Sequence, residues 1–447
     1  MRNDRNRRGF LRAAGVAVAR APPLLAQSAA SRSRIVGAND RIRVALIGCG
    51  GIGSNDLKNF LSIKNTECVA LCDVDAERSA KALKSIVEPL AQSPGLITKD
   101  FRRVVELRDL DAVMVATPDH WHALCTVAAC QAGKDVYVEK PLSLSIAEGR
   151  AMVESARKYN RVVQMGTQQR SAPHYTQAIN HVNSGKLGKI RLVRAWAYLD
   201  GLNPLPAEPD SAPPPSVDYD MWLGPAPKRP FNKNRFHFNF RWYWDYCGGL
   251  MTDWGAHMID IANGGMGIKA PTSAVAACGK FGYPTDATET PDTQHVIWKF
   301  PEFSMIWEHA AGLGRGPEAR DHGVAFHGEN GLLVVDRLGW EVYAESRHPN
   351  GGSREFRGLG VPRQIVYNDD SHQRHVRNFA DCVRSRGRPV SEVEIGHNSM
   401  IACHLGNIAY RLGCQVNWDV DNEKMINDRE AQSYVMREYR DPWKLTL

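Results

Sequence analysis

The chain has 447 residues, of which 43% are hydrophobic and 23% charged, and its formal net charge is +7. Residues 1–30 hold six Arg and one Asp, which account for +5 of this charge and leave +2 for the rest. So small an excess gives no reason to expect a nucleic-acid partner. About 415 residues follow this segment, too many for a single hydrophobic core, so we expect two domains.

The first 30 residues have the pattern of an export signal. Arg7 and Arg8 stand in the run Asn-Arg-Arg-Gly-Phe-Leu, and a short, modestly apolar stretch follows. A transmembrane helix needs about 20 apolar residues, whereas Arg20 and two prolines interrupt this stretch. We therefore predict a twin-arginine signal peptide over residues 1–30, a periplasmic location and no membrane anchor. A disordered basic arm is the alternative interpretation.

The ten cysteines are scattered, and they show neither a C-x-x-C motif nor the spacing of zinc ligands. Several fall in predicted strands or helices, where a small apolar side chain would serve equally well. Because the twin-arginine route carries folded proteins, the thiols can stay reduced until export, and we expect no disulfide framework.

From Arg41 onward, short apolar strands alternate with helical patterns. We expect strands at 42–47, 67–73, 111–117, 135–139 and 162–165, separated by helices at about 54–63, 76–88, 101–108, 121–132 and 146–159. Such alternation predicts a doubly wound parallel sheet, a Rossmann domain, over residues 41–165.

The first strand runs into a glycine-rich turn that is typical of a dinucleotide site. The glycines have the spacing G-x-G-x-x-G, and apolar residues at helical spacing follow them. In such a turn the glycines allow a tight bend, close approach of the pyrophosphate to the backbone, and packing of the helix on the sheet. We therefore assign to cofactor binding Gly48, Gly50, Gly51, Ile52 and Gly53.

Asp73 ends the second predicted strand, 20 residues after Gly53. A carboxylate at this place binds the ribose 2′-hydroxyl of a dinucleotide and would repel a 2′-phosphate. The predicted cofactor is therefore NAD rather than NADP, with Asp73 among its contacts.

Polar residues follow the third and fourth strands, at the carboxyl ends where open α/β sheets bind ligands. In the run 117–122 we assign Thr117, Pro118 and His122 to the cofactor, with helix capping by Asp119 as the alternative. The two histidines of this run lack a third ligand nearby, so no metal is predicted.

The run Glu139-Lys140-Pro141 follows the fourth strand, and we assign Glu139 and Lys140 to the cofactor. Lys140 is placed to reach a hydroxyl or carbonyl near the nicotinamide. Burial and neighbouring charges can bring the pKa of a lysine toward the range useful in proton transfer. An ordinary surface lysine is the alternative.

After Gly166 the pattern changes. A helix near 173–184, a strand at 190–199, a Pro-rich loop at 203–215 and an aromatic-rich segment at 222–254 come first. Strands then follow at about 273–281, 294–300, 303–310, 323–327 and 331–336, and helices at 372–386 and about 393–412. We predict a second domain over 166–415, built on a large, mostly antiparallel open sheet and serving substrate binding and oligomerisation, and an irregular tail over 416–447.

Asp253 and His257 stand four residues apart in the segment 248–260 and would share one face of a helix. Hydride transfer from an alcohol needs one group that fixes the hydroxyl and another that accepts its proton. A carboxylate beside an imidazole meets this need. Polar helix residues without a catalytic role are the alternative.

With its G-x-G-x-x-G motif, its Glu-Lys-Pro run and the segment 248–260, the chain resembles the Gfo/Idh/MocA family over about residues 41–415. The resemblance implies that Lys140, Asp253 and His257 are catalytic, and that His257 takes the proton of a sugar or polyol hydroxyl as hydride passes to the nicotinamide. It also implies a cis Lys140–Pro141 bond and a homodimer or homotetramer.

The aromatic-rich segment offers stacking faces beside polar groups, which suits carbohydrate rings. We assign to the substrate Gln168, Tyr243 and Trp244, together with Asp253 and His257. The aromatic core of an ordinary domain interface is the alternative for this segment.

The expected function is NAD-dependent oxidation of a hydroxyl on a sugar, glycoside or polyol. Exported members of the family imply an alternative, a glycosidase that oxidises a sugar carbon, eliminates the glycosidic oxygen, adds water and reduces the ketone again. Such a glycosidase needs a further base, for which Tyr243, His237 and His309 are candidates. A nucleotide-binding protein without turnover is the third possibility, which the presence of Lys140, Asp253 and His257 disfavours.

Overall fold

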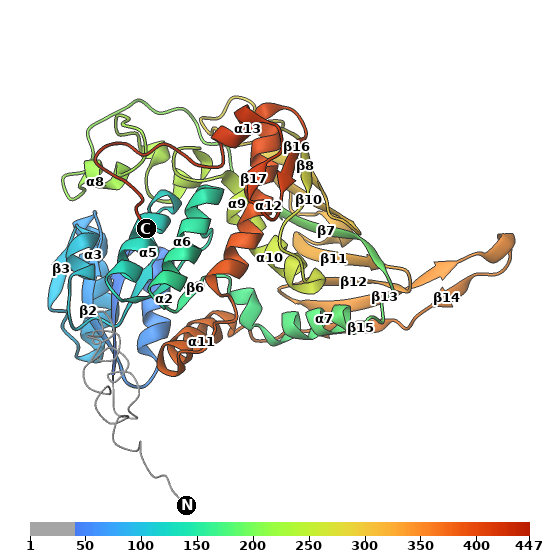
Figure 1. Cartoon of the computed structure of the whole chain (residues 1–447), viewed down its shortest axis with the longest axis horizontal. Helices are drawn as coiled ribbons and strands as arrows, with labels where there is room; N and C mark the ends of the chain where they lie inside the picture. The colour runs from blue at the N-terminus through green and yellow to red at the C-terminus, as the bar shows by residue number, and fades with distance from the viewer. Residues whose placement is uncertain (1–40) are drawn as a thin grey trace, which may run out of the picture. The chain divides into compact units, whose positions relative to one another are not determined.

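Two β-sheets organise residues 41–447, the part of the chain that the computed structural model describes (Figure 1). The predicted signal segment, residues 1–30, lies outside the described residues. In Figure 1 one sheet carries the blue N-terminal strands, and the other carries the later green-to-orange strands.

The first sheet is the predicted doubly wound parallel sheet. Its six strands lie in the order β3-β2-β1-β4-β5-β6, and all of their pairings are parallel. The strands are β1 (Ile42–Ile47), β2 (Thr66–Cys72), β3 (Leu96–Thr98), β4 (Ala112–Val115), β5 (Asp135–Val138) and β6 (Val163–Met165). The helices between them are α2 (Gly51–Leu61), α3 (Ala76–Ala82), α4 (Phe101–Val105), α5 (His122–Gln131) and α6 (Ile146–Lys158).

Two local features of this sheet differ from the prediction. The edge strand β3 was not expected, because a strand of three residues is too short to show an apolar alternation. The helix expected at 76–88 is α-helical only as far as Ala82. It continues as a π-helical turn (Leu83–Val87) and a 3₁₀ turn (Glu88–Leu90), and the chain leaves helical geometry just after Pro89.

The second sheet has eleven strands in the order β14-β13-β12-β11-β7-β10-β9-β8-β16-β17, with β15 paired to β13. Only the pair of β7 and β10 is parallel among its described pairings, which confirms a mostly antiparallel open sheet. The strands are β7 (Ile190–Leu199), β8 (Ser273–Gly279), β9 (Thr293–Lys299), β10 (Ser304–Ala311), β11 (His322–Gly328), β12 (Gly331–Asp336), β13 (Gly339–Arg347), β14 (Glu355–Arg357), β15 (Val361–Ile365), β16 (Val416–Asp419) and β17 (Lys424–Met425).

The helices of this part are α7 (Pro173–Asn183), α8 (Tyr219–Leu223), α9 (Gly249–Asp253), α10 (Gly255–Met266), α11 (Ser371–Ser385), α12 (Val393–Leu412) and α13 (Arg429–Ser433). Short helical turns are η3 (Asp119–Trp121), η4 (Gln168–Ser171), η5 (Lys233–Arg235), η6 (His237–Trp242), η7 (Pro317–Ala319) and η8 (Pro349–Gly351).

Helix α12 joins the two sheets. It contacts α6 beside the first sheet and also contacts α10 and the strands β8 and β9 of the second (Figure 1). It is buried on most of its surface, since 14 of its 20 residues are buried, and these include the polar residues His397, Ser399, His404 and Asn407. A backbone carbonyl of α12 also binds the second sheet: Ala402 O accepts a hydrogen bond from the indole nitrogen of Trp298 on β9 at 3.0 Å.

The tail 416–447 is more regular than expected. Strand β16 adds to the second sheet beside β8, and α13 follows the short strand β17. Beyond α13, Arg437 Nε donates to Glu148 Oε1 at 2.8 Å and Tyr439 Oη donates to the same oxygen at 2.6 Å. The Trp443 ring packs edge-on against Trp121, with centroids 4.7 Å apart. The tail therefore covers part of the first domain, a long-range pairing that local sequence patterns do not report.

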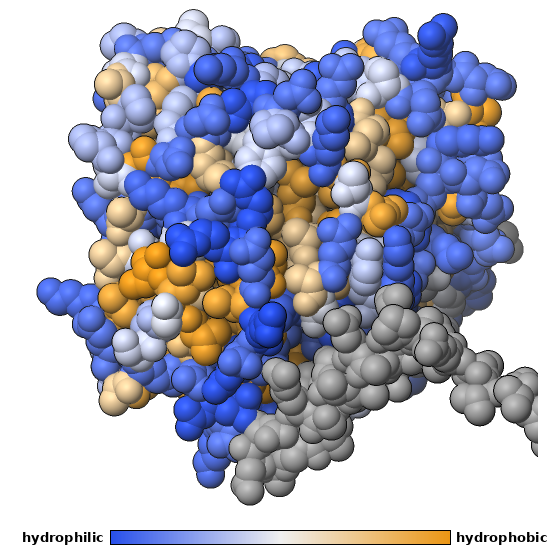
Figure 2. Space-filling model, turned by 60° about the vertical axis from the view of Figure 1, so that its left-hand side comes forward, coloured by the Kyte–Doolittle hydropathy of each residue, from blue (hydrophilic) through white to orange (hydrophobic). Residues whose placement is uncertain are grey.

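Residues 41–447 contain no helix that is both long and apolar enough to cross a bilayer. Figure 2 shows one face of the molecule, where hydrophilic side chains dominate and hydrophobic ones reach the surface in separate patches. Some apolar exposure of this kind is normal, because a folded chain has too little polar surface to cover itself. All ten cysteines lie in the described part and are free thiols.

We expect Arg437→Ala to lower the free energy of unfolding by about 3 kcal/mol, because it leaves the fully buried Glu148 carboxylate without its cation. Arg41→Ala is the control. It removes an exposed pair with Glu67 and should cost less than about 1 kcal/mol. Denaturant unfolding of both variants measures the difference, and equal effects would contradict a structural role for the tail.

Candidate active site

The glycine-rich turn after β1 has a geometry that only glycines allow. Gly48 has φ 96°, and a Cβ there would lie 2.5 Å from the carbonyl carbon of Ala116. A Cβ on Gly53 would collide with the carbonyl oxygen of Gly48. Helix α2 then begins at Gly51 without any side chain that caps its first N–H groups. These N–H groups are suited to hold a phosphate, as the motif predicts.

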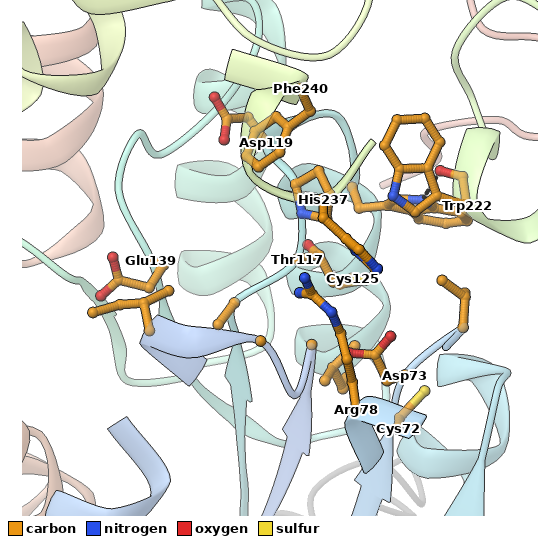
Figure 3. A pocket seen from close by; sticks show the side chains of 18 of the residues that line it. Cys72, Asp73, Arg78, Thr117, Asp119, Cys125, Glu139, Trp222, His237 and Phe240 are labelled. Carbon is orange, nitrogen blue, oxygen red and sulfur yellow. Dashed lines mark hydrogen bonds between the residues drawn. The ribbon is translucent and has the colours of Figure 1, made fainter. Parts of the chain in front are cut away.

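Asp73 holds this turn from the end of β2. Its Oδ2 accepts a hydrogen bond from Cys49 N at 2.7 Å, and its Oδ1 accepts one from Asp75 N at 2.9 Å. Burial raises the pKa of Asp73, while these two backbone donors and the charge of Arg78 oppose the rise. Arg78 lies at the same end of the site (Figure 3).

A cavity of about 400 Å³ connects Asp73 with Lys140. Figure 3 shows Asp73 and Arg78 at one end and Glu139 at the other. One wall consists of loops of the first domain, and it includes the predicted cofactor residues Gly48, Gly50, Gly51, Ile52, Asp73, Thr117, Pro118, Glu139 and Lys140. The aromatic-rich segment of the second domain provides the other wall, with Met221, Trp222, His237, Phe238, Phe240 and Arg241.

These residues fit a dinucleotide. Asp73 would hold the adenosine ribose, the start of α2 would hold the pyrophosphate, and the nicotinamide would lie toward Lys140. Burial and the nearby Asp56 raise the pKa of Glu139 well above its ordinary value.

His122, which the sequence assigned to the cofactor, does not line the cavity. Its Nδ1 lies 2.7 Å from Pro141 O and its Nε2 lies 2.9 Å from Thr117 O. The ring thus bridges the loops that follow β4 and β5. Burial lowers its pKa to about 4, so the ring is neutral near pH 7. Gly53 does not line the cavity either, because its role is to pack α2 against the turn.

The structure brings two of the predicted catalytic residues into direct contact. Lys140 Nζ donates to Asp253 Oδ1 at 2.6 Å and to Asp253 O at 3.2 Å. Arg241 Nε donates to the same Oδ1 at 3.4 Å. Burial opposes ionisation of Asp253, but the charges of Lys140 and Arg241 outweigh it and lower its pKa below the ordinary value. The Lys140–Pro141 bond is cis, as the resemblance implied.

His257 lies one turn beyond Asp253 and is buried. The expected single helix is wrong here, because α9 ends at Asp253 and α10 begins at Gly255, with Trp254 between them. His257 Nδ1 has no hydrogen-bond partner among the described residues. Burial, followed by the charges of Lys140 and Arg337, lowers the pKa of His257 well below its usual value. Nδ1 of the ring is thus available to a ligand, although His257 does not line the large cavity itself.

Of the residues assigned to the substrate, Tyr243, Trp244 and Gln168 do not line this cavity. Tyr243 is buried in an aromatic cluster with Trp222 and Tyr246, as the interface-core alternative described. The backbone nitrogen of Trp244 donates to Glu289, and its ring lies near Arg411. Gln168 lines a separate cavity of about 100 Å³ beside Arg337.

Arg241, like Arg78, is a site residue that the sequence did not reveal. It belongs to the aromatic-rich segment, twelve residues before Asp253, and no local period relates the two positions. A cation within an apolar segment is the one signal that could have identified it, since a buried arginine needs an anionic partner. Residues 41–447 contain no group of three or more side chains able to hold a metal ion.

Comparison with known proteins identifies the family. Residues 42–167 match the family model of the Gfo/Idh/MocA oxidoreductases, NAD-binding Rossmann fold, and residues 195–273 and 361–445 match the model of their C-terminal alpha/beta domain. The scyllo-inositol 2-dehydrogenase (NAD(+)) of Bacillus subtilis is 30% identical over 387 residues, which cover 85% of this chain and 97% of that protein. The chain therefore belongs to the Gfo/Idh/MocA oxidoreductase family, and its first domain is an NAD-binding domain.

Other matches are partial or structural. The inositol 2-dehydrogenase of Salmonella paratyphi B is 30% identical over 160 residues, 35% of this chain, so the match spans about half, 46%, of that curated relative. The solved structure of levoglucosan dehydrogenase with NADH and levoglucosan is 18% identical, with a TM-score of 0.62 over 85% of this chain and 99% of the other. This likeness confirms the fold.

We expect Asp73→Asn to reduce the difference in binding free energy between NAD and NADP by about 1–3 kcal/mol. The amide oxygen can still accept the hydrogen bond from Cys49 N, but the side chain no longer repels a 2′-phosphate. Fluorescence titration with NADH and NADPH measures it. Asp109→Asn, which alters an exposed carboxylate, is the control. Equal affinity of the unmodified protein for the two dinucleotides would refute the assignment.

Proposed function

We propose that this protein oxidises a hydroxyl group of a sugar, glycoside or polyol, with NAD as the hydride acceptor. The observation that carries the proposal is the contact of Lys140 with Asp253 at the end of the NAD cavity, with His257 one turn away. NAD, when bound, supplies the nicotinamide ring that takes up the hydride. The family relatives named for inositol and sugar oxidation support a polyhydroxylated substrate.

Each residue has a role that follows from its charge. Asp253 stays ionised and fixes the Lys140 ammonium, which donates a hydrogen bond to the substrate oxygen as it becomes a carbonyl. His257 receives the hydroxyl proton, because its Nδ1 has no hydrogen-bond partner among the described residues. The aromatic wall of the cavity excludes water from the reacting atoms.

The direct test is to purify the protein without added cofactor and to record the absorbance of bound nicotinamide. Inositols, aldoses and glycosides are then offered, and NADH formation and sugar products are followed. Binding of NAD without oxidation of any of these substrates would favour the nucleotide-binding protein without turnover.

We expect His257→Ala and Lys140→Ala to reduce turnover by about 10²–10⁴-fold, the usual contribution of a proton-transfer group. Both variants should still bind NAD, because neither side chain belongs to the glycine-rich turn. Steady-state NADH formation and titration with NADH separate the two effects. His348→Ala, at an exposed histidine, is the control, and wild-type turnover in both active-site variants would refute these roles.

We also propose that the protein is exported to the periplasm by the twin-arginine pathway, on the basis of Arg7 and Arg8 in the first 30 residues. This pathway carries folded proteins, so NAD can be loaded in the cytoplasm before export. A cofactor held through turnover suits a compartment with little free NAD.

Replacement of both Arg7 and Arg8 by Lys should leave folded, NAD-loaded protein in the cytoplasm. Cell fractionation followed by immunoblotting measures the distribution, with Arg2→Lys as the control outside the paired arginines. Normal delivery of the double variant to the periplasm would contradict the signal.

We propose a homodimer or homotetramer that forms through the open face of the second sheet. Strand β9 alternates buried and exposed residues, and Val275, Ile297 and Tyr343 are apolar or aromatic side chains exposed on this sheet. Light scattering in solution tests the assembly. A Val275→Glu/Ile297→Glu variant should be monomeric.

A further inference from the structure

We propose that Asp119 is a second acid–base residue of this site. It removes a proton from the carbon next to the carbonyl that hydroxyl oxidation creates. This inference rests on the proposed function, because that oxidation supplies the carbonyl.

Asp119 is placed at the reacting end of the cavity. It opens the short turn η3 directly after β4, and it lines the cavity together with Lys140 and Arg241. Asp119 is buried, with only 3% of its surface exposed. Figure 3 shows its carboxyl group beside Phe240, away from Asp73 and Arg78.

The carboxylate of Asp119 does not cap a helix. Neither η3 nor α5 receives a side-chain cap, so the helix-capping role that the sequence suggested for Asp119 is wrong. The thiol of Cys247 contacts the carboxyl, but Oδ2 has no hydrogen-bond partner among the described residues. A buried carboxyl oxygen without a partner is costly, which indicates that a ligand group completes it.

The charge state of Asp119 suits proton exchange. Burial and the charge of Asp253 raise its pKa to about 7, while the Cys247 thiol and the charges of Arg241 and Lys140 act in the opposite direction. Both forms are therefore populated near neutral pH, so the group can accept a proton and release it again.

The other candidates for a further base are engaged elsewhere. His237 Nε2 lies 3.2 Å from Asp75 Oδ2, at the adenosine end of the cavity. The two ring nitrogens of His309 contact the Trp307 indole N–H and Pro291 O. Tyr243 is enclosed in the aromatic cluster.

The chemistry requires no further oxidant. A carbonyl acidifies the hydrogen on the neighbouring carbon, and the Asp119 carboxylate takes that proton while the C–H electron pair forms an enolate. In a glycoside oxidised at carbon 3, two carbons from the anomeric carbon, the proton leaves carbon 2, the C–H electron pair forms a double bond between carbons 1 and 2, and the bond from carbon 1 to the glycosidic oxygen breaks. The departing oxygen is protonated by water, and Asp119 returns its proton to solvent. A glycoside is the substrate class in which this proton removal leads to bond cleavage.

The experiment supplies the ketone directly. A methyl 3-keto-glucoside is incubated in D₂O with the NAD-loaded protein, and deuterium uptake at carbon 2 is followed by NMR. Exchange should fall by at least about 10²-fold in Asp119→Asn, normalised to bound NAD measured by titration. In the unmodified protein the exchange rate should rise with pH through the pKa of about 7, because the carboxylate is the active form.

Two further variants secure the result. Asp119→Ala should regain exchange when formate is added, which a merely structural residue would not do. Asp381→Asn, at an exposed carboxylate of α11, should behave as the unmodified protein.

Wild-type exchange in Asp119→Asn, no exchange in the unmodified protein, or loss of NAD binding in step with loss of exchange would each overturn the inference. Exchange in a protein that oxidises no sugar would instead refute the proposed function and leave the role of Asp119 supported.

Discussion

The ion pair of Lys140 with Asp253 is the contact on which the site depends. Lys140 follows the parallel strand β5, and Asp253 ends α9 in the second domain, so the 2.6 Å contact joins the two domains where they enclose the cavity. Neither charge is well solvated, and each would be costly to bury alone. Arg241 also contacts Asp253, so two cationic side chains share this one carboxylate.

Much of the fold could be predicted because its patterns are local. The five strands expected in the first sheet and the five expected between 273 and 336 are present, each within a few residues of its predicted position. Strands β14 and β15 escaped prediction because their residues are exposed on both faces, so no apolar alternation marks them. Strand β16 is only four residues long, and it joins the large sheet through the distant strand β8, a pairing that no local pattern reports.

The candidate site also has one part that the sequence predicts and another that depends on long-range packing. The glycine-rich turn, Asp73 and Lys140 follow strands of the parallel sheet, and their place at its carboxyl edge is a consequence of topology that a sequence reveals. The neighbours of Asp253 arise from packing between domains. Arg241 and the burial of Tyr243 both depend on how the aromatic-rich segment folds over the cavity, which has no periodic signature.

His122 faces two carbonyl oxygens, one on each of the loops that hold the cavity. A neutral imidazole owns a single N–H, so it can satisfy only one of them at a time, and the other oxygen meets a lone pair. The tautomer therefore decides which of the two loops, the one with Thr117 or the one with Pro141, accepts a hydrogen bond from this ring.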